Sequence, residues 1–182
     1  MRLLKSVGLD FRVEPSRVEE SLLAAACRPA ETAQEWACAK TASVSEEFPE
    51  YWVLGADTIV TLDGRIFGKP ADPADAVRML ETLSGRTHEV ITGICIQNAQ
   101  RKYHRAGSIA TRVRFKPITR EEAQAYVRTT EPLDKAGAYG IQGIGSFLVQ
   151  SIEGSYTNVV GLPLCETVDW LLEAHIIRHH PA

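Results

Sequence analysis

The stretch that decides the fold is Tyr51-Trp52-Val53-Leu54-Gly55-Ala56-Asp57-Thr58. Its continuous apolar run, from Tyr51 to Ala56, is typical of a buried strand. Asp57 then follows at the carboxyl end of that strand, where α/β sheets form their ligand crevices. A carboxylate there can hold a divalent metal or accept a proton from water. The commoner alternative is an aspartate that caps a turn or pairs with a lysine.

The segments that follow predict a hairpin and then a helix. Residues 58–62 and 65–67 flank Asp63-Gly64, a strong hairpin signal. Asp72 is a good N-cap, with Pro73 in the first helical position. The apolar stripe of this helix comprises Ala76, Met79, Leu80 and Leu83, and Gly85 ends it.

Alternating patterns continue to the end of the chain. Long strands are expected at 88–97 and 102–116, and a capping box at 119–122 opens a helix that runs to about residue 129. Residues 137–145 carry four glycines and predict a shaped loop. A strand at 147–152 and a closing helix at 162–177 follow.

Upstream of the central stretch, the pattern predicts a helix at 1–7 closed by Gly8, a short strand at 11–13 and a helix at 29–44. Strands and helices therefore alternate, with at least one antiparallel pair. This order predicts an α/β domain in which one mixed sheet is flanked by helices.

Composition excludes several classes of protein. The chain has 182 residues, 45% of them hydrophobic, and a net charge of −3, which is typical of one globular domain. The charge gives no broad basic surface for nucleic acid polymers or lipid. Neither a membrane span nor a signal peptide is expected. The four cysteines have no spacing typical of a zinc site or a disulfide framework, which favours free thiols in the cytoplasm.

Two lysines are candidates for binding an anion. Lys69 lies between Gly68 and Pro70 on a stiff loop and can act as a point charge on a phosphate, although a solvated loop lysine is commoner. Lys40 has small or apolar neighbours, so it either points toward a site or is a surface lysine with a buried stem.

Two further candidates are polar residues in less regular segments. Gln142 lies between Ile141 and Gly143 and can read the edge of a base with its amide; the alternative is a capping glutamine in a turn. Glu19, with Glu20 beside it, can supply a metal ligand, and the alternative is a solvated acidic pair.

The order of these motifs over nearly the whole chain resembles the Maf family of nucleotide pyrophosphatases. Each motif alone is weak, but their joint order and spacing are specific. The resemblance rests on Val18-Glu19-Glu20, Ala39-Lys40, Gly55-Ala56-Asp57-Thr58, Leu62-Asp63-Gly64, Gly68-Lys69-Pro70, Leu83-Ser84-Gly85-Arg86-Thr87-His88, Glu131-Pro132, the stretch from Asp134 to Gly143, and Asn158-Val159-Val160-Gly161-Leu162-Pro163.

The resemblance implies a fold and an activity. The fold is two-lobed with a central cleft and is related to the inosine-triphosphate pyrophosphatases. The activity is hydrolysis of a nucleoside triphosphate to monophosphate and pyrophosphate with a divalent cation, Mg²⁺ or Mn²⁺. Asp57 matches the general base, and Glu19, Lys40 and Lys69 match residues that handle metal and phosphate. Thr58 and Gln142 match the branch that acts on dTTP and UTP.

One departure from the family pattern concerns the beginning of the chain. The family starts with a strand and a Ser-x-Ser-Pro-Arg-Arg loop, whereas this sequence starts inside the helix that follows them. The expectation is a single Maf-like domain over 1–182 whose start was chosen too late, or else a degraded copy. An inactive truncated copy, or a nucleotide-binding regulator of cell division without catalysis, therefore stays open as an alternative. The sequence leaves the oligomeric state open, a homodimer included.

Overall fold

The computed structural model describes residues 2–18 and 28–178. Its centre is a five-stranded sheet in the order β2-β1-β3-β4-β5, in which every neighbouring pair is antiparallel. The strands are β1 (Val53–Leu62), β2 (Arg65–Phe67), β3 (Thr87–Asn98), β4 (Tyr103–Phe115) and β5 (Val149–Glu153).

The prediction of a mixed sheet was therefore wrong, although the α/β class is confirmed. The helix between β2 and β3 does not make a parallel crossover. β3 returns to the other side of β1 and pairs with it in the antiparallel sense, from Val53↔Gln97 to Thr61↔Glu89. Alternation of strands and helices along the chain does not by itself fix strand direction.

The central stretch forms one strand where the sequence predicted two. β1 continues without a break through Asp57 and into the hairpin, so Asp57 lies in the middle of the strand and not at its carboxyl end. Its first six residues are only half-buried, and Tyr51 is exposed. The hairpin itself is confirmed: Asp63 and Gly64 have φ values of 53° and 78°, as a two-residue turn with a right-handed strand twist requires.

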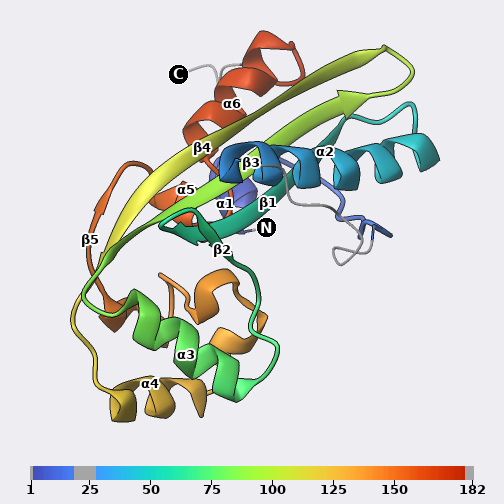
Figure 1. Cartoon of the computed structure of the whole chain (residues 1–182). Helices are drawn as coiled ribbons and strands as arrows, with labels where there is room; N and C mark the ends of the chain where they lie inside the picture. The colour runs from blue at the N-terminus through green and yellow to red at the C-terminus, as the bar shows by residue number, and fades with distance from the viewer. Residues whose placement is uncertain (1, 19–27, 179–182) are drawn as a thin grey trace.

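Helices cover both faces of the sheet (Figure 1). α2 (Pro29–Glu47) lies on one face, so closely that a Cβ on Gly93 would stand 2.1 Å from the Ala33 carbonyl oxygen. α6 (Leu164–Glu173) lies on the other, where a Cβ on Gly107 would meet the Trp170 ring at 2.9 Å. Gly107 pairs with Ile94, the neighbour of Gly93, so the two glycines face opposite sides.

A group of shorter helices packs beyond the β1–β2 hairpin (Figure 1). They are α3 (Pro73–Leu83), α4 (Arg120–Val127) and the 3₁₀ turns η2 (Glu131–Asp134), η3 (Ala136–Ala138) and η4 (Ile144–Leu148). The larger apolar core joins them to the strands, through Leu80, Phe115 and Tyr126 among others. The caps predicted at Asp72 and Thr119 are confirmed: each side chain accepts a hydrogen bond from the backbone of its helix's first turn.

Three local predictions need correction. Residues 11–13 form no strand: they are partly or fully exposed and pair with no strand in the part of the chain that the structure describes. β5 begins at Val149, since residues 144–148 wind into a 3₁₀ turn. The closing helix predicted at 162–177 is confirmed as α6 but ends earlier, at Glu173. A short helix that was not predicted, α5 (Tyr156–Val160), precedes it, and Gly161 with φ 117° and Pro163 separate the two.

The other helices follow the predictions closely. α1 (Arg2–Ser6) ends before Gly8, which has φ 74°. α2 starts at the predicted Pro29 and runs three residues past the predicted end. Within residues 2–18 and 28–178, no helix combines the length and apolar character that crossing a membrane requires.

Candidate functional site

A cleft of about 390 Å³ lies along the edge of β1. The short β2 pairs with β1 at Val60–Leu62, whereas β3 pairs with the other edge of β1 from Val53 to Thr61. Among the described residues, no strand therefore covers the β2-side edge of β1 next to Asp57. The cleft is lined by α2, β1, the loop after β2, the segment 134–142 and residues 159–161. Five of the six predicted site residues border it: Lys40, Asp57, Thr58, Lys69 and Gln142. The sixth, Glu19, lies outside the described residues.

The best-defined contact in the cleft is the ion pair between Lys40 and Asp57. Lys40 Nζ stands 2.5 Å from Asp57 Oδ1, and the two side chains are only 18% and 14% exposed. Asp57 reaches α2 because its partner in the sheet is Gly93, which lets the helix backbone approach the strand. The pairing of Asp57 with a lysine, which the sequence offered as the alternative to a site, therefore occurs inside the cleft.

Thr58 points to the opposite face of β1, toward α5. Its hydroxyl lies 2.9 Å from that of Thr92, which itself donates a hydrogen bond to the Asn158 carbonyl oxygen at 3.0 Å. A hydroxyl has a single hydrogen, so Thr58 must be the donor to Thr92. The remaining lone pairs of Thr58 are acceptors at the border of the cleft.

The loop that carries Lys69 is tied to the segment across the cleft. The Gly137 amide donates to the Gly68 carbonyl oxygen at 3.0 Å. Gly137 has φ 69°, and any Cβ there would meet the Val60 side chain at 2.9 Å, so only glycine fits. The charge of Lys69 is felt by Asp134, whose pKa is lowered mainly by a hydrogen bond from Lys135 and to a smaller extent by Lys69.

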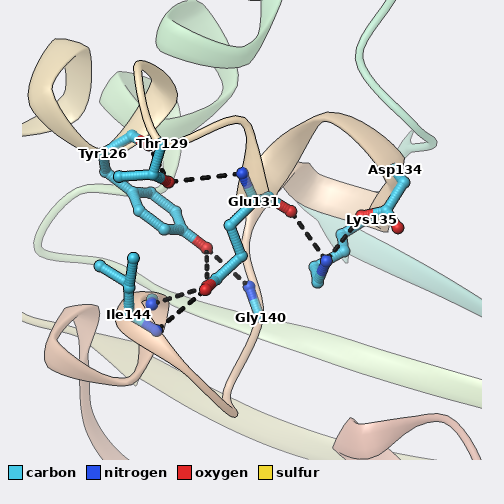
Figure 2. Close-up of polar contacts among 8 residues, drawn as sticks. Tyr126, Thr129, Glu131, Asp134, Lys135, Gly140 and Ile144 are labelled. Atoms are coloured by element: carbon cyan, nitrogen blue, oxygen red, sulfur yellow. Dashed lines mark hydrogen bonds and ion pairs between the residues drawn. The ribbon is translucent and has the colours of Figure 1, made fainter.

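Figure 2 shows how one carboxylate shapes the glycine-rich segment. Glu131 Oε1 accepts hydrogen bonds from the Tyr126 hydroxyl at 2.8 Å and the Gly145 amide at 2.9 Å, while Oε2 accepts one from the Ile144 amide at 3.0 Å. Burial raises the pKa of Glu131, but the donors outweigh it and the net pKa is lowered. Tyr126 also accepts from the Gly140 amide at 3.1 Å. The segment 140–145 is thus held from inside by side chains of α4 and η2.

This arrangement presents Gln142 on the outside of the segment. Gln142 is exposed, and its Nε2 donates to the Tyr156 hydroxyl at 3.3 Å. The amide oxygen and the second amide hydrogen retain capacity for a ligand.

A buried histidine joins the segment to the sheet. His88 of β3 lies 2.8 Å from the Tyr139 hydroxyl through Nε2 and meets the rings of Tyr139 and Phe115 edge-on. Burial lowers the pKa of His88 to about 4, so the ring is neutral near pH 7. Tyr139 lines the cleft, and its position is therefore fixed by β3.

Sequence reasoning gave no role to two residues that line the cleft. Trp36 lies one helical turn before Lys40 on the same face of α2. The signal in the sequence was the four-residue spacing between an aromatic residue and a lysine. Lys135 adds a third lysine, held by the Glu131 carbonyl oxygen at 2.7 Å and Asp134 at 2.6 Å. In the sequence, the position of Lys135 beside a glycine-rich stretch was the signal that it lines a ligand site.

The donors near Asp57 fit a hard cation. Mg²⁺ is commonly held by one or two carboxylates, with substrate phosphates and water as the remaining ligands. Asp57 offers one carboxylate, of which Oδ1 bonds to Lys40. Among the described residues, no cluster of three acidic, histidine or cysteine ligands surrounds it, so a cation here would depend on the substrate's own oxygens.

A second cluster lies on the same face of the sheet. Cys38 of α2, Cys95 of β3 and His104 of β4 have ligand atoms that all lie within 4.8 Å of one another. A hydrogen bond from Cys95, opposed by burial and aided by His104, lowers the pKa of Cys38 to about 6. The same hydrogen bond and burial raise the pKa of Cys95. Sequence spacing gave no indication of this cluster, because its members come from three elements.

A larger groove, of about 650 Å³, borders the first half of β1. Its lining is mainly apolar, with Phe48, Trp52 and Leu171 among its members, and Lys40 is the residue it shares with the cleft. The cleft carries three lysines and two aspartates in its smaller volume. Its charges suit a polyanion with a bound cation, and its neighbouring glycines admit a ligand close to the backbone.

Comparison with known proteins gives a consistent result. The family model described as Maf-like protein matches residues 1–174. The dTTP/UTP pyrophosphatase of Moorella thermoacetica is 48% identical over 169 residues, 93% of this chain and 87% of that protein. The proteins of the same name from Citrifermentans bemidjiense and Desulfotalea psychrophila are 50% identical over 169 residues and 44% identical over 178. These alignments cover 93% and 96% of this chain, and 87% and 89% of the relatives.

Proposed function

Because this chain belongs to the Maf family, we propose that it hydrolyses dTTP and UTP to the monophosphate and pyrophosphate. The observation that carries the proposal is the Lys40–Asp57 pair inside a cleft that also holds Lys69 and Lys135. Relatives at 44–50% identity bear the name of this activity. The reaction consumes one water, breaks the bond between the α- and β-phosphates and transfers the oxygen of water to the α-phosphorus.

The residues of the cleft have different roles in the reaction. Hydrolysis of a phosphoanhydride needs positioning, charge neutralisation and an oriented water. Asp57, held by Lys40, accepts the proton of the attacking water. Lys40, Lys69 and Lys135 offset negative charge on the triphosphate and on the departing pyrophosphate. The two halves of the cleft, α2 with β1 and the segment 134–142, act as two lobes around the substrate, as in the inosine-triphosphate pyrophosphatases.

A divalent cation belongs to this proposal. Asp57 is its ligand from β1, and Glu19 is proposed as a second carboxylate ligand. When bound, the cation neutralises phosphate charge and polarises phosphoryl oxygens.

Substrate choice is assigned to Thr58 and Gln142. Uracil and thymine present a ring N–H between two carbonyl groups. Thr58 has already donated its hydrogen to Thr92 and offers only lone pairs, which suit that N–H. Gln142 can donate its amide to a carbonyl of the base. Cytosine has no hydrogen at the same ring nitrogen, and 7-methylguanine is larger and positively charged, so both fit less well.

The test is a panel of dTTP, UTP, CTP, ATP and 7-methyl-GTP, with pyrophosphate release measured as kcat/KM and binding measured separately. We expect dTTP and UTP to exceed CTP by about 10-fold or more, as a matched base contact of 1–3 kcal/mol provides. Preference for ATP or 7-methyl-GTP contradicts the assignment. Binding of dTTP without release of pyrophosphate would instead support a regulator that binds nucleotides without catalysis.

A further inference from the structure

The cluster of Cys38, Cys95 and His104 lies where three elements meet. Cys95 is buried on β3, Cys38 is half-buried on α2, and His104 is exposed on β4. The Cys95 sulfur stands 3.5 Å from His104 Nε2. None of the three residues borders the cleft that holds Asp57.

The register of the sheet explains why these side chains converge. Cys95 pairs with Ala106, and Gln97 pairs with His104, so Cys95 and His104 are diagonal neighbours on one face. α2 covers that face, because Gly55 pairs with Cys95 and a Cβ on Gly55 would meet the Thr41 hydroxyl at 2.1 Å. Cys38 therefore approaches the β3–β4 pair from the face of the sheet that α2 covers.

The distances suit a tetrahedral metal ion. Zinc lies about 2.3 Å from a thiolate sulfur and about 2.0–2.1 Å from an imidazole nitrogen, so ligand atoms in a tetrahedral site stand roughly 3.5–3.8 Å apart. The distance between Cys95 and His104 has this value already, at 3.5 Å. With every pair inside 4.8 Å, the remaining ligands need to close by about 1 Å at most to reach tetrahedral geometry.

The ligand chemistry selects the metal. Two thiolates and an imidazole favour soft or borderline ions, whereas Mg²⁺ and Mn²⁺ favour oxygen. We propose that Cys38, Cys95 and His104 bind a zinc ion, with water in the fourth position, at a site separate from the nucleotide cleft. Binding releases the two thiol protons to solvent, and His104 coordinates through Nε2 while Nδ1 keeps its proton.

The exposure of His104 gives the ion a route of entry, and the elements that carry the three ligands determine its structural effect. The ion enters from the side of His104, which is open to solvent, and reaches the buried sulfur of Cys95 last. Once bound, it joins α2 to β3 and β4. Since α2 also carries Lys40, zinc stabilises the helix position on which the cleft depends.

The test uses the reduced, chelator-treated protein titrated with Co²⁺ and then with Zn²⁺, in the absence of nucleotide. Bound Co²⁺ should give the intense visible bands of a tetrahedral site and a thiolate-to-cobalt charge-transfer band, and Zn²⁺ should abolish both. An oxygen-ligand site at Asp57 gives no thiolate band, so failure of the proposed hydrolase activity leaves this readout unaffected. Zinc should also raise the melting temperature, because it binds the folded state.

Variants make the assignment specific. His104→Gln changes an exposed residue and should fold; we expect it to bind Co²⁺ at least about 10-fold more weakly. Cys38→Ser removes one of the two thiolates and should lower the intensity of the charge-transfer band by about half. Cys165→Ser, at an exposed cysteine of α6, is the matched control and should bind like the parent. The proposal is overturned if the reduced parent protein binds no Co²⁺ through sulfur. It is also overturned if the Cys38→Ser band equals that of the parent, or if the thiols form only a disulfide.

Discussion

The two sides of the cleft are held in different ways. On one side, Lys40 projects from a long helix and Asp57 from a strand that pairs with β3 from Val53 to Thr61, and regular backbone hydrogen bonds fix both. On the other side, the segment 134–145 has only short 3₁₀ turns, and side chains bonded to backbone amides fix its course. The side chains of Glu131 and Tyr126 accept three such bonds between them, from the Ile144, Gly145 and Gly140 amides, and are bonded to each other (Figure 2).

This difference assigns different tasks to the two sides. Regular elements place charged groups accurately, so the sheet side suits the reacting atoms. A segment held by a few side-chain bonds can be varied without disturbing the core, so it suits the recognition of the base. Substitutions of Lys40 and Asp57 on the sheet side should therefore affect turnover, and those on the loop side should affect the stability of the segment and, together with Thr58, substrate choice.

The largest effect is expected from Asp57→Asn. The change keeps the shape of the side chain and removes its charge and basicity, so kcat should fall by about 10²–10⁴-fold. The measurement is pyrophosphate release from dTTP at saturating substrate, with melting curves to confirm folding.

The matched control for that variant is Asp63→Asn in the hairpin turn. Asn is well tolerated at φ 53°, and Asp63 does not belong to the lining of the cleft. It should retain parental kcat. If Asp57→Asn also retained it, the sheet side would not carry the chemistry.

His88 joins the two sides, and it makes the stability of the protein depend on pH. Its folded pKa of about 4 lies below the ordinary 6.5, so the unfolded state takes up a proton first as the pH falls. The stabilisation is complete above pH 6.5 and is lost progressively from there to pH 4, by about 3 kcal/mol at most.

The variant His88→Gln separates this contribution from other titrations. Glutamine can still bond to the Tyr139 hydroxyl but does not titrate, so the free energy of unfolding should fall less steeply between pH 6.5 and 4. His175→Asn, at an exposed histidine with φ 54°, is the control and should keep the parental slope. Equal slopes in all three proteins would contradict the assignment to His88.

The same contrast explains what could be predicted from the sequence. The hairpin at Asp63-Gly64, the cap at Asp72 and the capping box at Thr119 depend on local chemistry, and all are confirmed. Strand direction and the unbroken course of β1 through Asp57 were missed, because long-range pairing with β3 decides them.

The candidate site shows the same limit. Five predicted residues border one cleft. They could be predicted because the motifs were recognised as a set, whereas the spacing within any one motif does not indicate a cleft. The partners Glu131 and Tyr126, and the meeting of Cys38 with Cys95 and His104, follow only from tertiary contacts. Local pattern carries no information about such contacts.

A smaller effect is expected from Glu131→Gln on the loop side. An amide has one acceptor oxygen, so its NH₂ group would face either the Ile144 amide or the donors at Oε1. One donor, exposed at Ile144 or part-buried at Oε1, then loses its partner, and the free energy of unfolding should fall by about 0.5–1.5 kcal/mol. KM for dTTP should rise more than kcat falls. Glu50→Gln, an exposed control, should change neither quantity.

The smallest effect is expected from Gln142→Glu. This variant sharpens the comparison between the two sides of the cleft, because it leaves the hydrogen bonds of Glu131 and Tyr126 to the segment intact. Gln142 makes one long bond, to Tyr156 at 3.3 Å, so its loss should shift the melting temperature little. The carboxylate has no donor for a carbonyl of thymine or uracil and adds a negative charge near the phosphates. We therefore expect kcat/KM for dTTP and UTP to fall by about 10-fold, with a smaller fall for 7-methyl-GTP, whose positive charge a carboxylate favours. Parallel measurement of the two substrates in parent and variant gives the ratio. An equal fall for both would mean that the added charge acts on the triphosphate, and that the loop side does not select the base through this residue.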